Sequence, residues 1–122
     1  MTTQFNYDEI SDTLYISFVP GERATGIELN DYLLLRINKK EGRAVGLTIF
    51  EYSILVQPTE WGPRSFPLTG LAQSSADLRT LVFSILQQPP VNEWLTVSAY
   101  IPAAITDPTP ITAVKPLAMA TA

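Results

Sequence analysis

The stretch 13-TLYISFV-19 decides the fold class, because its side chains alternate between apolar and polar. Leu14, Ile16 and Phe18 are separated by residues that carry hydroxyl groups. Successive side chains of a β-strand point to opposite faces, so the pattern predicts a strand with one apolar face and one polar face. The apolar face of the resulting sheet needs a cover from elsewhere in the chain.

Further short runs in the N-terminal half also show signs of extended structure and are separated by turn residues. Gly42, in the last of these turns, is expected to adopt a positive φ, which a residue without a Cβ atom does at little steric cost. We predict an antiparallel β-meander with strands over residues 4–7, 13–19, 25–30, 33–38 and 43–50.

One amphipathic helix is expected over residues 75–88, and it would supply the cover. Ser74 is the candidate N-cap, and Asp77 places a carboxylate in the first turn, where it meets the positive end of the helix dipole. Pro89 and Pro90 should end the helix, because proline cannot continue its hydrogen-bond ladder. Apolar side chains recur at spacings of three and four residues and form one stripe: Leu78, Leu81, Val82, Ile85 and Leu86.

The C-terminal part predicts a sixth strand over residues 94–101 that extends the same sheet, and a short edge strand over 110–114. The fold class is therefore α+β: an antiparallel sheet of about five to seven strands with one main helix packed on one face. We expect a single domain, residues 1–122. Its parts are a β-meander (1–56), a Pro-rich loop (57–73), a helix and a strand (74–101) and a Pro/Ala/Thr-rich arm (102–122).

Composition narrows the possible functions. The 122 residues include no Cys and no His, and the formal net charge is −4. These absences exclude Cys–His catalysis, Ser–His–Asp triads and zinc or thiol redox sites. The net negative charge disfavours binding to an extended stretch of nucleic acid, whose phosphates are also negative. No apolar run is long enough to cross a membrane and the first residues lack a signal-peptide pattern, so we expect a cytoplasmic location without membrane attachment.

The densest acidic cluster consists of Asp8, Glu9 and Asp12. Three carboxylates this close could hold a hard cation such as Mg²⁺ or Ca²⁺, which would make the chain a metal binder or a carboxylate-dependent enzyme. The interpretation that we favour is structural, because aspartates readily accept hydrogen bonds from backbone N–H groups in turns. We therefore expect Asp8 and Asp12 to close the first hairpin, and we predict no cofactor.

Four of the eight basic residues lie around one hairpin: Arg36, Lys39, Lys40 and Arg43. They could bind RNA or an acidic partner. Lysines at a hairpin tip more commonly prevent edge-to-edge pairing of strands, and we favour that interpretation. The hairpin tip also lacks aromatic residues on which bases could stack.

Two tryptophans, Trp61 and Trp94, are candidates for an aromatic partner-binding surface, although such residues more often close the ends of a small core. Glu28, Asp31 and Glu51 are nominal candidates for acid–base catalysis. No spacing distinguishes them from ordinary surface carboxylates, so no catalytic residue is assigned.

The segment 7-YDEISDTLYI-16 resembles the opening motif of the bacterial DUF2283 family, in which Tyr-Asp and a second Asp precede Leu-Tyr-Ile. The later segment 42-GRAVGLTI-49 resembles the second landmark of that family, and Ser53 matches the Ser that closes the pattern. The resemblance spans residues 4–53. It implies a small β-rich cytoplasmic domain with no established reaction.

These observations favour a non-catalytic module for protein interaction or oligomerisation. The usual catalytic side chains are missing, whereas edge strands and a Pro-rich arm offer surfaces for strand addition. The expected partner is a second copy of the chain or another small protein. The alternatives are the metal site at the acidic turn and the basic hairpin that binds RNA or an acidic partner.

Overall fold

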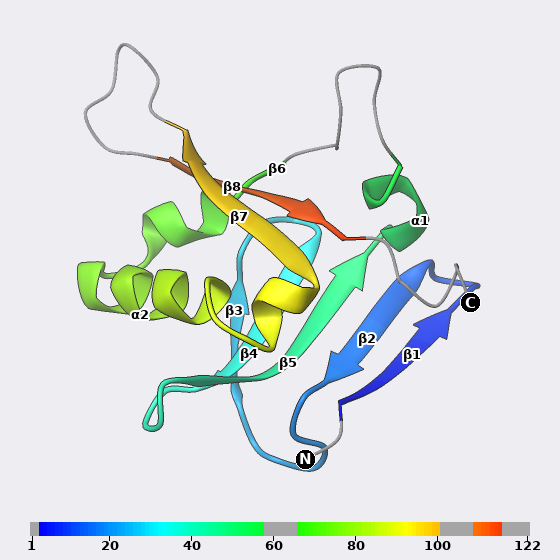
Figure 1. Cartoon of the computed structure of the whole chain (residues 1–122), viewed down its shortest axis with the longest axis horizontal. Coiled ribbons are helices and arrows are strands. Elements are labelled where there is room, and N and C mark those ends of the chain that lie inside the picture. The colour runs from blue at the N-terminus through cyan, green and yellow to red at the C-terminus, as the bar shows by residue number, and fades with distance from the viewer. Residues whose placement is uncertain (1–2, 58–65, 101–108, 116–122) are drawn as a thin grey trace.

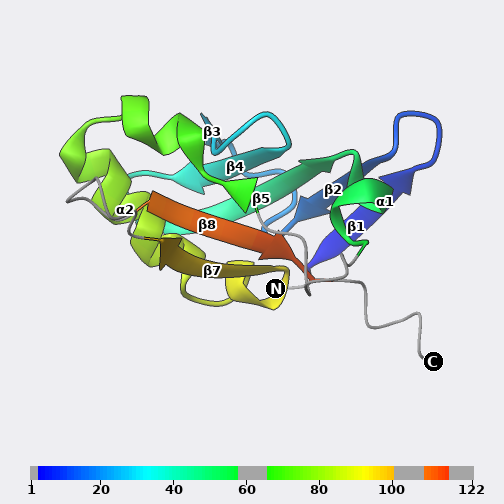
Figure 2. The ribbon, with the colours of Figure 1, turned by 90° about the horizontal axis from the view of Figure 1, so that it is seen from above.

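The computed structural model describes residues 3–57, 66–100 and 109–115. It has two layers (Figures 1 and 2), which Figure 2 shows most plainly: a five-stranded sheet faces a second layer made of a smaller sheet and the main helix. This is the α+β fold with one main helix that the sequence predicts.

The five predicted N-terminal strands are all present, and their bounds differ from the predicted ones by no more than two residues. All pairings are antiparallel. The five strands are β1 (Gln4–Asp8), β2 (Thr13–Ser17), β3 (Thr25–Glu28), β4 (Leu33–Asn38) and β5 (Arg43–Phe50).

The strand order is β1-β2-β5-β4-β3, which differs from the order of a simple meander. The strand β5 lies in the middle of the sheet, with β2 on one side and β4 on the other. It is the longest strand, and Ala44 to Ile49 are all buried, so it is the strand that gains most from a central position. The strand β3 is consequently an edge strand.

The predicted extension of this sheet by residues 94–101 is wrong. The strand β7 (Leu95–Tyr100) belongs to a separate antiparallel sheet with β6 (Phe66–Pro67) and β8 (Thr109–Val114). The order β6-β8-β7 places β8 in the centre, so the predicted edge position of 110–114 is also wrong. Likewise, the predicted loop around residue 66 contains a short strand.

Geometry explains the second sheet. A helix with its side chains is about 10 Å wide, whereas five strands spaced by about 4.8 Å span roughly 20 Å. The helix therefore covers only part of the apolar face. The three-stranded sheet covers a further part (Figure 2).

The main helix, α2 (Ala76–Leu86), begins one residue later than predicted. Its N-cap is Ser75, whose side chain accepts a hydrogen bond from the backbone N–H of Leu78, so the predicted cap at Ser74 is wrong. The backbone N–H of Ser74 instead donates to the carbonyl of Leu71 at the end of the 3₁₀-helix η1 (Thr69–Gln73). Two shorter elements are α1 (Tyr52–Leu55) and the 3₁₀-helix η2 (Val91–Glu93).

A single hydrophobic core lies between the layers. The predicted apolar face of the first sheet is buried there, and α2 contributes Val82, Ile85 and Leu86. Polar contacts join the layers at the β3–β4 end, where the side-chain amide of Asn30 donates to the carbonyl of Pro67. Within the described ranges, no helix is long and apolar enough to cross a membrane.

Candidate interaction surface

The β1–β2 turn is closed by the side chain of Asp8. Its Oδ1 atom accepts a hydrogen bond from the backbone N–H of Ile10 (3.0 Å), and its Oδ2 atom accepts one from the Ser11 hydroxyl (2.9 Å). Asp8 thus has the predicted role of stabilising the first hairpin. The turn carries Ile10 at its tip with 99% of its surface exposed.

Asp12 links this hairpin to the start of α1. Its carboxylate accepts hydrogen bonds from the Ser53 backbone N–H (3.0 Å), the Ser53 hydroxyl (2.7 Å) and the Tyr7 hydroxyl. Its carbonyl accepts from the Tyr52 N–H at 2.9 Å. Asp12 and Glu51 both have a φ of 53°, a conformation that most residues avoid. The hydrogen bonds between Asp12 and the start of α1 therefore join two turns, each of which contains a residue with positive φ.

These hydrogen bonds shift the pKa values of the groups that make them. The hydrogen bond to Asp12 is the main reason why the pKa of Tyr7 rises to about 12, since ionising the phenol would break it. The hydrogen bonds from Tyr7 and Ser53 lower the pKa of Asp12.

In the part of the chain that the structure describes, no group of three acidic residues is arranged to hold a metal ion. Asp8 and Asp12 accept hydrogen bonds from the turn residues Ile10 and Ser11 and from Tyr7 and Ser53, respectively.

We expect Asp12→Ala to destabilise the protein by about 1 kcal/mol near neutral pH, the net value of a solvent-accessible hydrogen bond or two. The lowered pKa of Asp12 means that this contribution is present above the unfolded pKa and is lost as the pH falls through the folded one. Urea denaturation of both proteins at pH 7 and pH 2.5 measures the difference. If the difference in unfolding free energy between the two proteins were the same at both pH values, the stabilising role of the Asp12 carboxylate would be contradicted.

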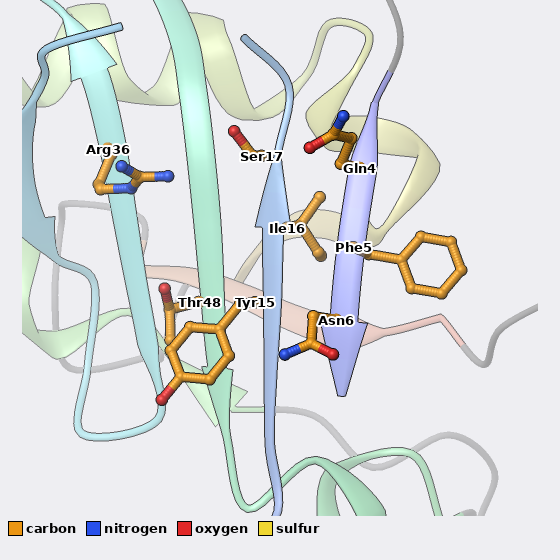
Figure 3. Close-up of a pocket in the computed structure, with 8 residues that line it drawn as sticks. All are labelled: Gln4, Phe5, Asn6, Tyr15, Ile16, Ser17, Arg36 and Thr48. Atoms are coloured by element: carbon orange, nitrogen blue, oxygen red, sulfur yellow. The ribbon is translucent and has the colours of Figure 1, made fainter. Parts of the chain in front are cut away.

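The basic residues of the β4–β5 hairpin do not form one patch. Arg43 pairs with Glu22 and Glu41, each at 2.7 Å, and the hydrogen bond to Glu22 is the main reason that its pKa rises. Lys39 and Lys40 are exposed at the tip. Arg36 lies apart from them, on the face of the first sheet that points away from the second layer (Figure 3). The acidic partners of Arg43 reduce the positive charge at the tip.

The aromatic candidates are also separated. Trp94 packs against the core and makes an edge-to-face contact with Phe5, with ring centroids 5.7 Å apart. Trp61 lies outside the described residues. Trp94 thus packs between the core and β1.

The nominal catalytic carboxylates do not converge on one site. Glu28 and Asp31 line a shallow hollow of about 370 Å³ beside η1, and Glu51 does not line it.

The outer face of the first sheet carries a shallow depression of about 470 Å³ (Figure 3). Arg36 extends over Gly46 on the neighbouring strand, where a Cβ atom would lie 2.8 Å from both Nε and Cζ of the guanidinium. Of the residues at this site, the sequence marks only Arg36 as a candidate, although a glycine inside a strand signals a close approach by another group. The depression is lined by Gln4, Phe5, Asn6, Tyr15, Ile16, Ser17, Arg36 and Thr48.

The strand β1 forms one edge of the five-stranded sheet. It contains neither Lys nor Pro, the residues that commonly prevent further pairing at an edge. Phe5 and Tyr7 are 45% and 38% exposed. The opposite edge, β3, is shorter and contains a glycine and a glutamate. β1 is therefore the better edge for adding a strand.

These features define a two-layer α+β protein in which no described element covers the outer face of the first sheet or pairs with the free edge of β1. The family model described as protein of unknown function (DUF2283) matches residues 4–53, as the resemblance predicts. The matched segment includes Asp12 and its two hydrogen-bond donors, Tyr7 and Ser53, and it ends before the second layer begins. Comparisons with curated proteins and with solved structures found no match.

Proposed function

We propose that this protein is a non-catalytic interaction module that forms a homodimer by antiparallel pairing of two β1 strands. The observation that carries the proposal is the unprotected β1 edge, with two exposed aromatic side chains in a strand of five residues. Strand addition at such an edge gains main-chain hydrogen bonds along the whole strand.

The sequence of β1 is complementary to itself. A two-fold axis through Asn6 pairs Phe5 of one copy with Tyr7 of the other, and Gln4 with Asp8. Directly opposed aromatic residues stabilise an antiparallel pair, whereas opposed like charges destabilise it. This register has two aromatic pairs and no opposed like charges, and one interface repeated by a two-fold axis forms a closed dimer.

The absence of catalytic chemistry in the sequence supports a binding role. The chain has no His or Cys. Of the described groups, those whose pKa clearly shifts are held in hydrogen bonds or ion pairs between turns: Tyr7, Asp12, Glu22 and Arg43. The shifts thus accompany structural contacts.

Light scattering coupled to size-exclusion chromatography tests the proposal. We expect a species with twice the 13.5 kDa mass of the chain, at concentrations from micromolar to millimolar. Asn6→Lys places two ammonium groups opposite each other at the two-fold axis, so this variant should be monomeric. Circular dichroism and a melting curve establish that the variant folds.

Thr25→Lys is the matched control, since it adds the same charge to the exposed first residue of the other edge strand, β3. This variant should remain dimeric. A wild-type protein that stays monomeric throughout the concentration range overturns the proposal, as does an Asn6→Lys variant that dimerises as well as the control.

A further inference from the structure

We infer that the open face of the first sheet holds a binding site for a small organic monocarboxylate, centred on Arg36 and the bare backbone of Gly46. The site lies on the outer face of the sheet, whereas strand pairing uses the main chain of β1. Three residues of β1, Gln4, Phe5 and Asn6, also belong to its lining, but the inference does not depend on dimer formation. It rests on the geometry of the depression, on the charge of Arg36 and on the side chains that surround it.

The sheet register creates a flat floor for the site. Gly46 pairs with Ser17 on β2 and with Arg36 on β4, so the three residues form one row across the sheet. Gly46 has no side chain, and a Cβ atom in its place would overlap Nη2 of Arg36. The guanidinium therefore lies against the backbone of β5, as the sticks in Figure 3 show.

Arg36 has no acidic partner among the residues that the structure describes. No carboxylate among the described residues forms an ion pair with Arg36, in contrast to Arg43, which has two. Arg36 is the only charged residue of the eight that line the depression, and it is half-buried. A planar guanidinium binds a carboxylate through two parallel hydrogen bonds. A single cation on a protein of net charge −4 favours a ligand with one negative charge over a multivalent anion.

The surrounding side chains suit the rest of such a ligand. The Ser17 hydroxyl lies across β5 from the guanidinium, and the amide groups of Gln4 and Asn6 lie farther away, on the edge strand β1 (Figure 3). Tyr15 is 45% exposed, and its ring offers an apolar surface beside Thr48, its partner on β5. The volume of about 470 Å³ falls within the range of small-molecule sites.

A titration with benzoate, followed by ¹⁵N–¹H nuclear magnetic resonance, tests the inference. Benzoate combines one carboxylate with a ring that can pack on Tyr15. We expect saturable shifts of the Ser17, Gly46 and Thr48 amides and of the Arg36 Nε–H signal. Inorganic phosphate, used as a second probe, should bind more weakly. Tighter binding of phosphate than of benzoate would overturn the assignment to a monocarboxylate.

Three variants locate the site. Arg36→Gln should weaken benzoate binding by about tenfold or more, because it removes the charged partner of the carboxylate. Gly46→Ala keeps the charge but displaces the flexible end of Arg36, and it should also weaken binding. Arg23→Gln removes an exposed charge from the β2–β3 loop and should leave the affinity unchanged. Shifts that never saturate, or equal affinity in Arg36→Gln and the wild type, would overturn the inference.

Discussion

A chain that ends at residue 57 should not fold, although it contains the whole five-stranded sheet and the whole segment that matches the family model. The second layer supplies the other wall of the core through these side chains: Leu68, Leu71, Val82, Ile85, Leu86, Val91, Leu95 and Val114. Without them the inner face of the sheet is open to water, including Leu14, Ile16, Leu33, Leu35, Ile37, Leu47 and Ile49.

The expected loss exceeds the stability of an ordinary domain. Burying one large apolar side chain contributes about 1.5–3 kcal/mol, so uncovering seven costs on the order of 10 kcal/mol. Whole domains have a free energy of unfolding of about 5–15 kcal/mol. Circular dichroism and amide resonance dispersion of the fragment, with the full chain as reference, measure the outcome. A fragment that is monomeric, with a cooperative melting transition, would show that the sheet does not need this cover.

The strands of the first sheet could be predicted because each carries its own pattern. The run Leu33–Asn38 alternates buried and half-buried side chains, and both of its bounds are as predicted. The helix was found in the same way, from the spacing of its apolar residues. Its cap was misplaced by one residue because two adjacent serines, Ser74 and Ser75, have equal chemistry, and only the preceding turn decides between them.

The arrangement of the strands could not be predicted, because it depends on partners far apart in the chain. Apolar and polar residues alternate over residues 94–101, and this pattern fits a sixth strand of the first sheet as well as a strand of a second sheet. The area left uncovered by the helix decides between them, and it is known only once the layers are assembled. Trp94 is an example of such a distant partner, since it packs on Phe5 of β1.

The same limit applies to the candidate site. The role of Asp8 was accessible because its partners lie within three residues. The partner of Asp12 is Ser53, 41 residues away, and the floor under Arg36 is Gly46 on the next strand. Those contacts follow from the register of β5, which the sequence alone does not specify.

Gly70→Ala should be among the most destabilising single substitutions in the described part of the chain. Gly70 is the second residue of η1, and its backbone N–H donates to the carbonyl of Leu29 at 2.9 Å. A Cβ atom at this position would overlap the carbonyl oxygen of Glu28 and lie 3.1 Å from that of Leu29. Backbone atoms cannot rotate away as a side chain can, so η1 must move off the sheet. We expect a loss of about 3 kcal/mol, near the upper end of the usual cost of overpacking.

The matched control is Gly26→Ala on β3, where a Cβ atom would lie at an ordinary distance of 3.5 Å from the Leu34 side chain. This substitution should be neutral or stabilising by about 0.5 kcal/mol, because alanine loses less conformational freedom than glycine on folding. Urea denaturation of the two variants measures both effects. Equal stability of the two would show that η1 can shift without cost, and the close approach at Gly70 would then not hold the second layer on the sheet.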